Sequence, residues 1–339
     1  VLLRSVTYCS GGEWIDGVCR GDFKMMGSKR RNNIAALDLS TGTVTALEPG
    51  RERSGVLLAT DGTTVYSEAS SPSMGAAKES HRGGIDAATG NPTPWNPGAD
   101  GIVYSWSING STVYAGGGFA HVAGQPRNNI AAVDAATGVA TSWNPNADRD
   151  VYAVLASGST IYAGGLYSFI GGQARSRIAA LDASTGNATA WNPAADGFVQ
   201  TLAKSGSTRS TLGAVSRASA GVLRSYLAAL DQTTGNATAW APEPSLWVYA
   251  IWPGTSAIYA GGTFTSVGGQ ARAHIAALDP VSGMPTAWNP NSSGPISAIA
   301  VSGSTVYVGG DFANIGGSDH HFLAGNPRRS RRCPASRTG

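Results

Sequence analysis

The sequence has little lysine, methionine or cysteine, few charged residues and no long apolar run. Charged residues make up 13% of the 339 residues, and no apolar stretch approaches the roughly 20 residues that a membrane-spanning helix needs. We therefore predict no transmembrane segment. The chain begins Val1-Leu2-Leu3-Arg4, without an initiator methionine or a signal peptide, so we expect a mature chain or a fragment of a longer one.

The positive formal charge comes from five arginines near the C-terminus. Without Arg328, Arg329, Arg331, Arg332 and Arg337 it falls from +3 to −2. The rest of the chain therefore lacks the basic surface with which proteins bind nucleic acid, and we expect no nucleic-acid partner.

Three cysteines are too few for a disulfide scaffold. Cys9 and Cys19 could close one small disulfide loop, which would indicate an oxidising compartment, or both could be free thiols. Cys333 is then left over. The five histidines are scattered without the spacing of zinc ligands.

What the chain does contain is a tandem repeat, together with 46 glycines and abundant Thr, Ser, Ala and Val. These residues favour many short strands and tight turns over helices. Five tryptophans, each five residues after the Gly of an Asp-x-x-(Thr/Ser)-Gly turn, are spaced by 48, 48, 49 and 48 residues: Trp95, Trp143, Trp191, Trp240 and Trp288. Leu47 takes this position in the first unit.

The best-formed unit predicts four strands, at 151–156, 160–164, 178–182 and 187–191. Turns rich in Gly, Ser and Asp join the first strand to the second and the third to the fourth. Four antiparallel strands in about 48 residues is the size of one propeller blade.

The second-strand element recurs seven times, so we predict an all-β, seven-bladed β-propeller of four-stranded antiparallel blades. It occurs near Cys19, Tyr66, Tyr114, Tyr162, Leu212, Tyr259 and Tyr307. The predicted blades are 1–50, 51–98, 99–146, 147–194, 195–243, 244–291 and an incomplete 292–324, all in one domain. Residues 325–339 would be a basic tail, either disordered or a translation artefact.

Residues that recur in every unit are predicted to be structural, because a single site does not have to be built five times. The tryptophans would pack between neighbouring blades. Charged residues would tie the long connections together through charge-assisted bonds. These are Arg31, Arg127, Arg175, Arg224 and Arg272, each seven residues before Asp38, Asp134, Asp182, Asp231 and Asp279.

Two segments resemble the delta-sixty type β-propeller repeat of bacterial surface and secreted proteins. They are Ser-Gly-Ser-Thr-Val-Tyr-Val-Gly-Gly-Asp-Phe at 302–312 and Trp-Asn-Pro-x-Ala-Asp-Gly at 191–197, and the likeness covers nearly the whole chain. It implies a propeller outside the cytoplasm, often joined to adhesion or sugar-binding modules.

A second resemblance is to quinoprotein repeats, through Ile-Ala-Ala-Leu-Asp-x-x-Thr-Gly followed by Trp. It would imply an eight-bladed enzyme with pyrroloquinoline quinone. The seven units and the lack of an adjacent cysteine pair argue against it, and we predict no cofactor.

No catalytic motif or metal site is predicted. The chain has no Gly-x-Ser-x-Gly, His-Glu-x-x-His or phosphate-binding loop. Asn146, Asp148 and Asp150 resemble the start of a calcium loop, but the bidentate Glu of such loops does not follow.

Two segments break the repeat while the spacing around them is kept: 67–84 in the second unit and 213–221 in the fifth. GC-rich codons for 213–221, read one base out of frame, encode Gly-Gly-Phe-Thr-Ser-Val-Gly-Gly, close to the intact segment at 261–269. We hypothesise compensating frameshifts here and in the basic tail. If the segments are genuine, blades two and five are irregular and would be the place for a site.

We expect a non-catalytic, monomeric binding or scaffolding module, extracellular or on the cell surface, with a glycan or surface protein as ligand. The face that carries the long second-to-third-strand connections and the blade-to-blade connections would bind the ligand. The expected contacts are His121, Gln125, Tyr167, Phe169, Gln173, Trp247, Phe264, Gln270 and His274. The alternatives are a propeller enzyme, either a quinoprotein-like oxidoreductase or a polysaccharide hydrolase or lyase, and a structural spacer in a larger surface protein.

Overall fold

The structure is a computed structural model, and every regular element that it describes is a β-strand. The described residues are 18–20, 25–26, 29–30, 34–36, 55–60, 64–69, 82–86, 91, 93–204, 211–213, 218–219, 221–254, 256–302, 305–319 and 323–327. No helix in this part of the chain is long and apolar enough to cross a membrane. Cys9, the basic tail after residue 327 and most of the two irregular segments lie outside the described residues.

The main strands form six three-stranded antiparallel sheets and one strand pair within these residues. The pair is β1 (Val18–Arg20) with β4 (Ile34–Ala36). The sheets are β5 (Gly55–Thr60), β6 (Thr64–Ala69) and β7 (Arg82–Asp86); β8 (Ile102–Asn109), β9 (Thr112–Gly118) and β12 (Ile130–Asp134); β13 (Val151–Ser157), β14 (Thr160–Gly165) and β17 (Ile178–Asp182); β18 (Leu202–Lys204), β19 (Thr211–Gly213) and β22 (Ala228–Leu230); β23 (Val248–Pro253), β24 (Ile258–Gly262) and β27 (Ile275–Leu278); and β28 (Ile296–Ser302), β29 (Thr305–Gly310) and β32 (Leu323–Pro327).

Each connection from the second to the third strand of a main sheet contains a small two-stranded hairpin wherever the connection is described. The sequence predicted only loops here. The hairpins are β10 (His121–Val122) with β11 (Gln125–Pro126), β15 (Phe169–Ile170) with β16 (Gln173–Ala174), β20 (Ala218–Ser219) with β21 (Val222–Leu223), β25 (Ser266–Val267) with β26 (Gln270–Ala271), and β30 (Asn314–Ile315) with β31 (Ser318–Asp319); β2 (Met25–Met26) and β3 (Lys29–Arg30) form a similar pair between β1 and β4.

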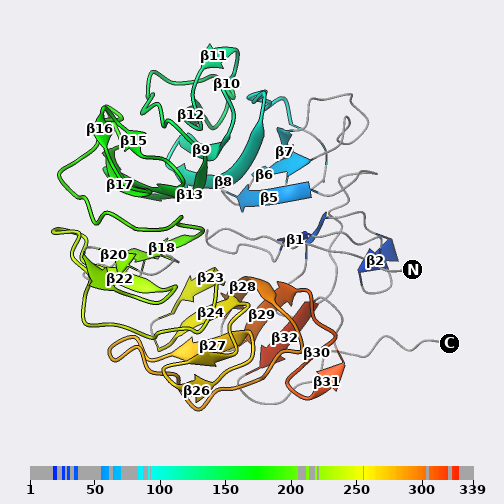
Figure 1. The fold of residues 1–339 in the computed structure, drawn as a ribbon. Helices are drawn as coiled ribbons and strands as arrows, with labels where there is room; N and C mark the ends of the chain where they lie inside the picture. The colour runs from blue at the N-terminus through cyan, green and yellow to red at the C-terminus, as the bar shows by residue number, and fades with distance from the viewer. Residues whose placement is uncertain are drawn as a thin grey trace.

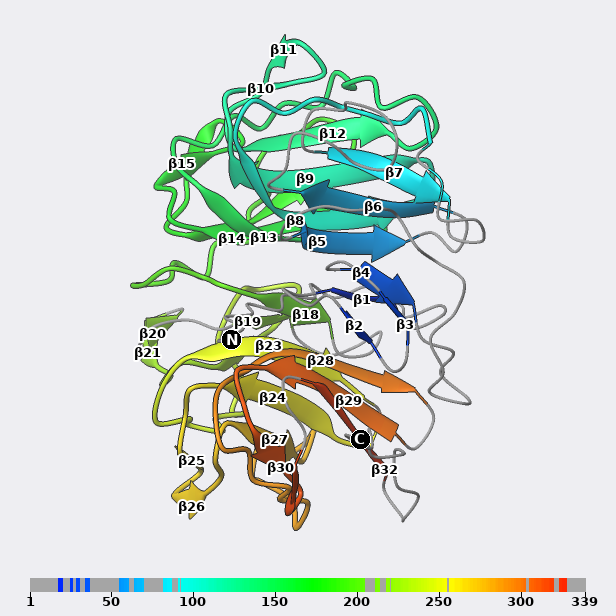
Figure 2. The same ribbon diagram turned by 90° about the vertical axis from the view of Figure 1, so that its right-hand side faces the viewer.

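The sheets follow one another around a common centre, with the first strand of each sheet innermost (Figure 1). Strand β5 contacts β8, β8 contacts β13, β13 contacts β18, and the series continues through β23 to β28. Strand β1 contacts β5. In Figure 2 the hairpins β15, β20–β21 and β25–β26 lie along the left side of the molecule. This is the arrangement of a β-propeller.

The predicted fourth strand is wrong in detail, because the sheets have three strands in the described residues. In the best-formed unit, residues 187–191 pair with β17 through one bridge, Leu181 to Ala188. Backbone bonds from Asp182 N to Asn187 O and from Thr189 N to Ala180 O flank that bridge. The segment then leaves the sheet at Trp191, because the Trp191 indole binds the next unit. The following Asn192-Pro193 pair also interrupts the ladder, because proline has no backbone N–H to donate.

The predicted tail also starts too early. Strand β32 extends to Pro327 and pairs with β29, with Thr305 opposite Pro327. In the intact unit Thr160 lies opposite Asp182 in the same way. The last unit therefore keeps its third strand in register.

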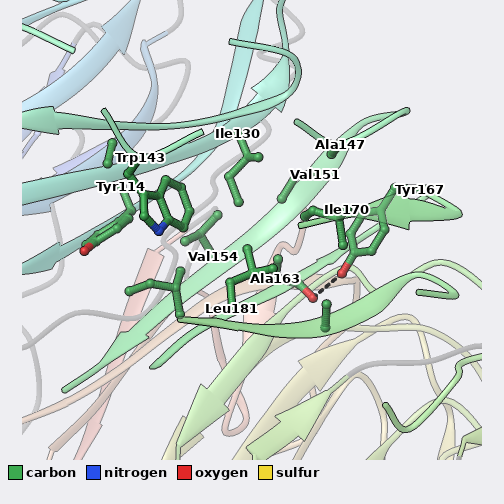
Figure 3. Close-up of a cluster of buried hydrophobic side chains, with 13 residues drawn as sticks. Tyr114, Ile130, Trp143, Ala147, Val151, Val154, Ala163, Tyr167, Ile170 and Leu181 are labelled. Atoms are coloured by element: carbon green, nitrogen blue, oxygen red, sulfur yellow. Dashed lines mark hydrogen bonds between the residues drawn. The ribbon is translucent and has the colours of Figure 1, made fainter. Parts of the chain in front are cut away.

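The core lies between successive sheets. In Figure 3, Tyr114 and Trp143 of one unit lie in the same cluster as Val154 and Leu181 of the next. The tryptophan indole also donates a hydrogen bond to the next unit, from Trp143 Nε1 to the Asp182 carbonyl at 2.9 Å. The same bond recurs from Trp95 to Asp134, from Trp191 to Asp231 and from Trp240 to Asp279.

The first Gly of each Gly-Gly pair permits this close packing. A Cβ atom on Gly164 would lie 2.6 Å from Val199 Cγ1, and one on Gly116 would lie 2.7 Å from Val154 Cγ2. Both contacts are shorter than real Cβ atoms make, so a side chain at these positions would push neighbouring units apart.

Candidate functional site

The hairpins are held by side chains from the connection that precedes each inner strand. Asp148 Oδ1 accepts hydrogen bonds from the amides of Ser168 (2.8 Å) and Phe169 (3.0 Å). Asp100 binds the amides of hairpin β10–β11 in the same way. In later units a serine hydroxyl replaces the carboxylate: Ser245 accepts from the amides of Thr265 and Ser266, and Ser293 from those of Ala313 and Asn314.

The recurring arginines bind the hairpins to their own sheets. Arg175 donates from Nη1 to the Ala174 carbonyl at 2.8 Å and from Nη2 to the Thr189 carbonyl at 2.5 Å. Arg127, Arg224 and Arg272 repeat both bonds. The recurring aspartates bind elsewhere. Asp182 Oδ1 accepts from the amides and hydroxyls of Ser184 and Thr185, which holds its pKa down at about 2.

The first-unit positions Arg31 and Asp38 lie outside the described residues. Trp95, Trp143, Trp191 and Trp240 are buried, whereas Trp288 is partly exposed.

Most of the expected ligand contacts are exposed on the hairpins. Phe169 is 45% exposed. Gln125, Gln173 and Gln270 lie at exposed positions where the second hairpin strand begins. The side chain of His121 is 53% exposed, and its Nδ1 lies 2.8 Å from Asp100 Oδ2. The backbone and side-chain hydrogen bonds of His121 lower the pKa of Asp100 to about 2.

Two expected contacts, Tyr167 and Phe264, are wrong, because both side chains are fully buried. Tyr167 packs in the cluster of Figure 3, where its hydroxyl donates to the Ala163 carbonyl at 2.6 Å. Burial raises the pKa of this phenol well above its usual value. These rings fasten the hairpin to the sheet and face away from solvent.

His274 is partly buried and has a positive φ of 64°. Its Nδ1 atom is buried with no hydrogen-bond partner in the structure, and burial lowers the pKa of the imidazole. Tyr226 occupies the equivalent position in the preceding unit, with a φ of 58°. His274 is therefore placed at the base of its hairpin, whereas the glutamines are at the tip.

Trp247 is part of a larger aromatic arrangement that the sequence did not predict. Its indole stacks on Phe198, with ring centroids 4.9 Å apart, and meets Tyr226 edge-on at 5.1 Å. Phe198 meets Tyr152 at 6.2 Å, and Tyr152 meets Tyr104 at 5.2 Å. All five rings are partly exposed. We call them the aromatic row.

The aromatic row lies at the hairpin end of the inner strands. Tyr104 and Tyr152 sit at register shifts near the starts of β8 and β13, where the inner strand has one residue more than its partner. Such bulges turn a side chain out of the regular alternation of the strand. We call this end of the sheets, with the aromatic row and the hairpins, the hairpin face.

The Asp150 carboxylate lies two residues before Tyr152 in the chain. Its oxygens lie 3.3 Å from where a Cβ atom on Gly118 would be. Partial burial, and then the charge of Asp150, raise the pKa of the Tyr152 phenol. Of the other two residues of the calcium-like segment, Asp148 caps a hairpin and Asn146 Oδ1 accepts from Asn128 Nδ2. Among the described residues no three His, Cys, Asp or Glu side chains form a metal-binding group.

No family model and no curated protein matches this chain. Solved structures of two other proteins serve as examples of a similar fold. One is the computationally designed Ika8 protein, with a TM-score of 0.57 and 15% identity over 92% of this chain and 82% of that chain. The other is a chain of the mitotic checkpoint complex, with a TM-score of 0.58 and 12% identity over 81% of this chain and 77% of that chain. At these identities the likeness concerns the fold alone, and together with the antiparallel sheets it supports a β-propeller.

Proposed function

We propose that the chain is a closed, seven-bladed propeller, secreted or attached to a cell surface, that binds a glycan or protein through its hairpin face. The β1–β4 pair would belong to the first blade, and β1 contacts β5 of the second. The extracellular location rests on the resemblance of the repeats to the delta-sixty type.

One observation carries the choice of face. The residues that build each hairpin repeat from unit to unit, whereas the residue that opens the hairpin does not. In four units this residue is His121, Phe169 or Asn314, which are exposed, or Ser266, which is partly exposed. A fixed frame that presents different side chains is suited to recognition, since a rigid scaffold with variable surface groups favours binding.

A blocking experiment tests the face without assuming which residue touches the ligand. In a background with Cys9, Cys19 and Cys333 changed to Ser, Gln173→Cys places one thiol on a hairpin. Val281→Cys places it at the opposite end, in a turn where the valine is 70% exposed. Each variant is coupled to a large polyethylene glycol maleimide and offered a glycan array and a panel of bacterial surface proteins.

We expect at least one ligand to be retained by the unmodified chain and by the Val281→Cys conjugate. The Gln173→Cys conjugate should lose most of that binding. Equal binding by both conjugates, or no ligand from either panel, would contradict the proposed function. Antiserum detection of the native protein in extracellular, surface and cytoplasmic fractions tests its location, and a cytoplasmic signal alone would contradict secretion.

A further inference from the structure

We propose that the aromatic row binds an extended segment of a neutral polysaccharide, with several sugar units lying across successive rings. This inference rests on the proposed function and specifies its ligand.

The shape of the row favours a linear polymer. Tyr104, Tyr152, Phe198 and Trp247 come from four successive units, and each ring centroid lies 4.9–6.2 Å from the next. A small molecule would contact one or two of these rings. A chain of sugars can contact all of them and gain binding energy from each.

The chemistry of the rings favours a carbohydrate. A sugar ring has an apolar C–H face and a polar edge of hydroxyl groups. The row offers the partly exposed apolar surface of the stacked Phe198 and Trp247 rings, and phenol groups from Tyr104, Tyr152 and Tyr226. The Asp150 carboxylate, two residues before Tyr152 and partly exposed, can accept hydrogen bonds from sugar hydroxyls. Aromatic walls with a few convergent polar groups are typical of binding sites.

The charges around the row favour a neutral ligand. Asp148 already caps a hairpin. Arg177 donates to the Ser176 hydroxyl and the Ala195 carbonyl, and Arg175 binds two further carbonyls. The exposed Arg149 lies between Asp148 and Asp150 in the chain, so this segment carries charges of both signs and no excess of positive charge. An anionic polymer would need a cluster of available positive charge.

Affinity electrophoresis of the full chain tests the proposal. Native gels would contain hydroxyethyl cellulose, soluble β-1,3-glucan, xylan or, as an anionic control, polygalacturonate. We expect at least one neutral polymer to retard the chain. Tyr152→Ala and Trp247→Ala should each weaken retardation about tenfold or more, since central aromatic contacts dominate such surfaces. Tyr152→Phe keeps the ring and should lose much less.

Matched variants separate this inference from the proposed function. Phe169→Ala removes an exposed aromatic ring of the hairpin face that is not in the row, and should leave retardation unchanged. Tyr104→Ala serves in place of Trp247→Ala if thermal melts show that the latter is unfolded. Retardation that persists in Tyr152→Ala but is lost in Phe169→Ala would contradict binding by the aromatic row. The same result would still support binding through the hairpin face. Retardation by no neutral polymer, or by polygalacturonate alone, would also overturn it. A surface protein as the captured ligand would support only the broader proposal.

Discussion

At the scale of single residues, the indole N–H of four of the repeated tryptophans joins its own unit to the next. Trp191 is buried, and its Nε1 donates to the Asp231 carbonyl at 2.8 Å. We expect Trp191→Phe to lower the free energy of unfolding by about 1–3 kcal/mol, because the partly buried Asp231 carbonyl loses its donor and the smaller ring leaves space in the core. Urea denaturation followed by circular dichroism measures this.

Trp288→Phe is the matched control, because Trp288 is partly exposed and the described residues include no equivalent bond from its indole. It should cost clearly less. An equal cost for both substitutions would show that ring volume, and not the bond between units, is what matters.

The turn aspartates predict a dependence of stability on pH. Hydrogen bonds from Ser184 and Thr185 lower the pKa of Asp182 from 3.8 to about 2 in the folded chain. A folded pKa below the unfolded value means that the ionised carboxylate stabilises the fold above about pH 4, and that this contribution disappears between about pH 4 and pH 2. We expect Asp182→Asn to melt at a lower temperature than the wild type at pH 7 and at about the same temperature at pH 2. An equal difference in melting temperature at pH 7 and pH 2 would contradict a stabilising role of the ionised Asp182 carboxylate.

At the scale of elements, one side chain caps each of four hairpins: Asp100, Asp148, Ser245 and Ser293. Asp148→Ala would leave the amides of Ser168 and Phe169 without their acceptor. We expect hydrogen exchange of these two amides to accelerate several-fold, while exchange in β14 and β17 stays unchanged. In another unit the Ser245 hydroxyl accepts hydrogen bonds from the equivalent amides, so Asp148→Ser should keep the exchange slow. Equally fast exchange in both variants would contradict the capping role.

Sequence periodicity predicted the elements of the best unit well and the connections poorly. The predicted strand 178–182 coincides with β17, and 151–156 is one residue shorter than β13. The prediction of a fourth strand at 187–191 was wrong, because the sequence pattern of a segment that pairs along its whole length is the same as that of a segment that pairs at one bridge. The hairpins were missed because two-residue strands carry no alternation to recognise.

The same limits apply to the candidate site. Tyr167 and Phe264 were predicted as contacts because loop aromatics suggest binding, but in this repeat that position anchors the hairpin. The aromatic row was missed because its members are about 48 residues apart. The period itself would have revealed part of it, since Tyr104 and Tyr152 occupy the same register of adjacent units.

At the scale of the whole molecule, successive units are held by tryptophan bonds and by glycines that allow close approach. Among the described residues the bonds run from the second unit to the sixth. This serial pattern makes stability depend on neighbouring pairs, as in other repeat proteins. The hairpins β10–β11, β15–β16, β25–β26 and β30–β31 are each bonded to the segment that precedes the inner strand of their unit, so these hairpins and the aromatic row share one end of the sheets.

Closure of the ring is the central claim, and an experimental crystal structure of the chain would test it directly. We predict seven sheets around one axis, with β1 and β4 between β28 and β5 and the five rings of the aromatic row at the hairpin end. An open arc, with β5 and β28 unconnected by a seventh sheet, or with Tyr152 and Trp247 turned away from a common face, would contradict it.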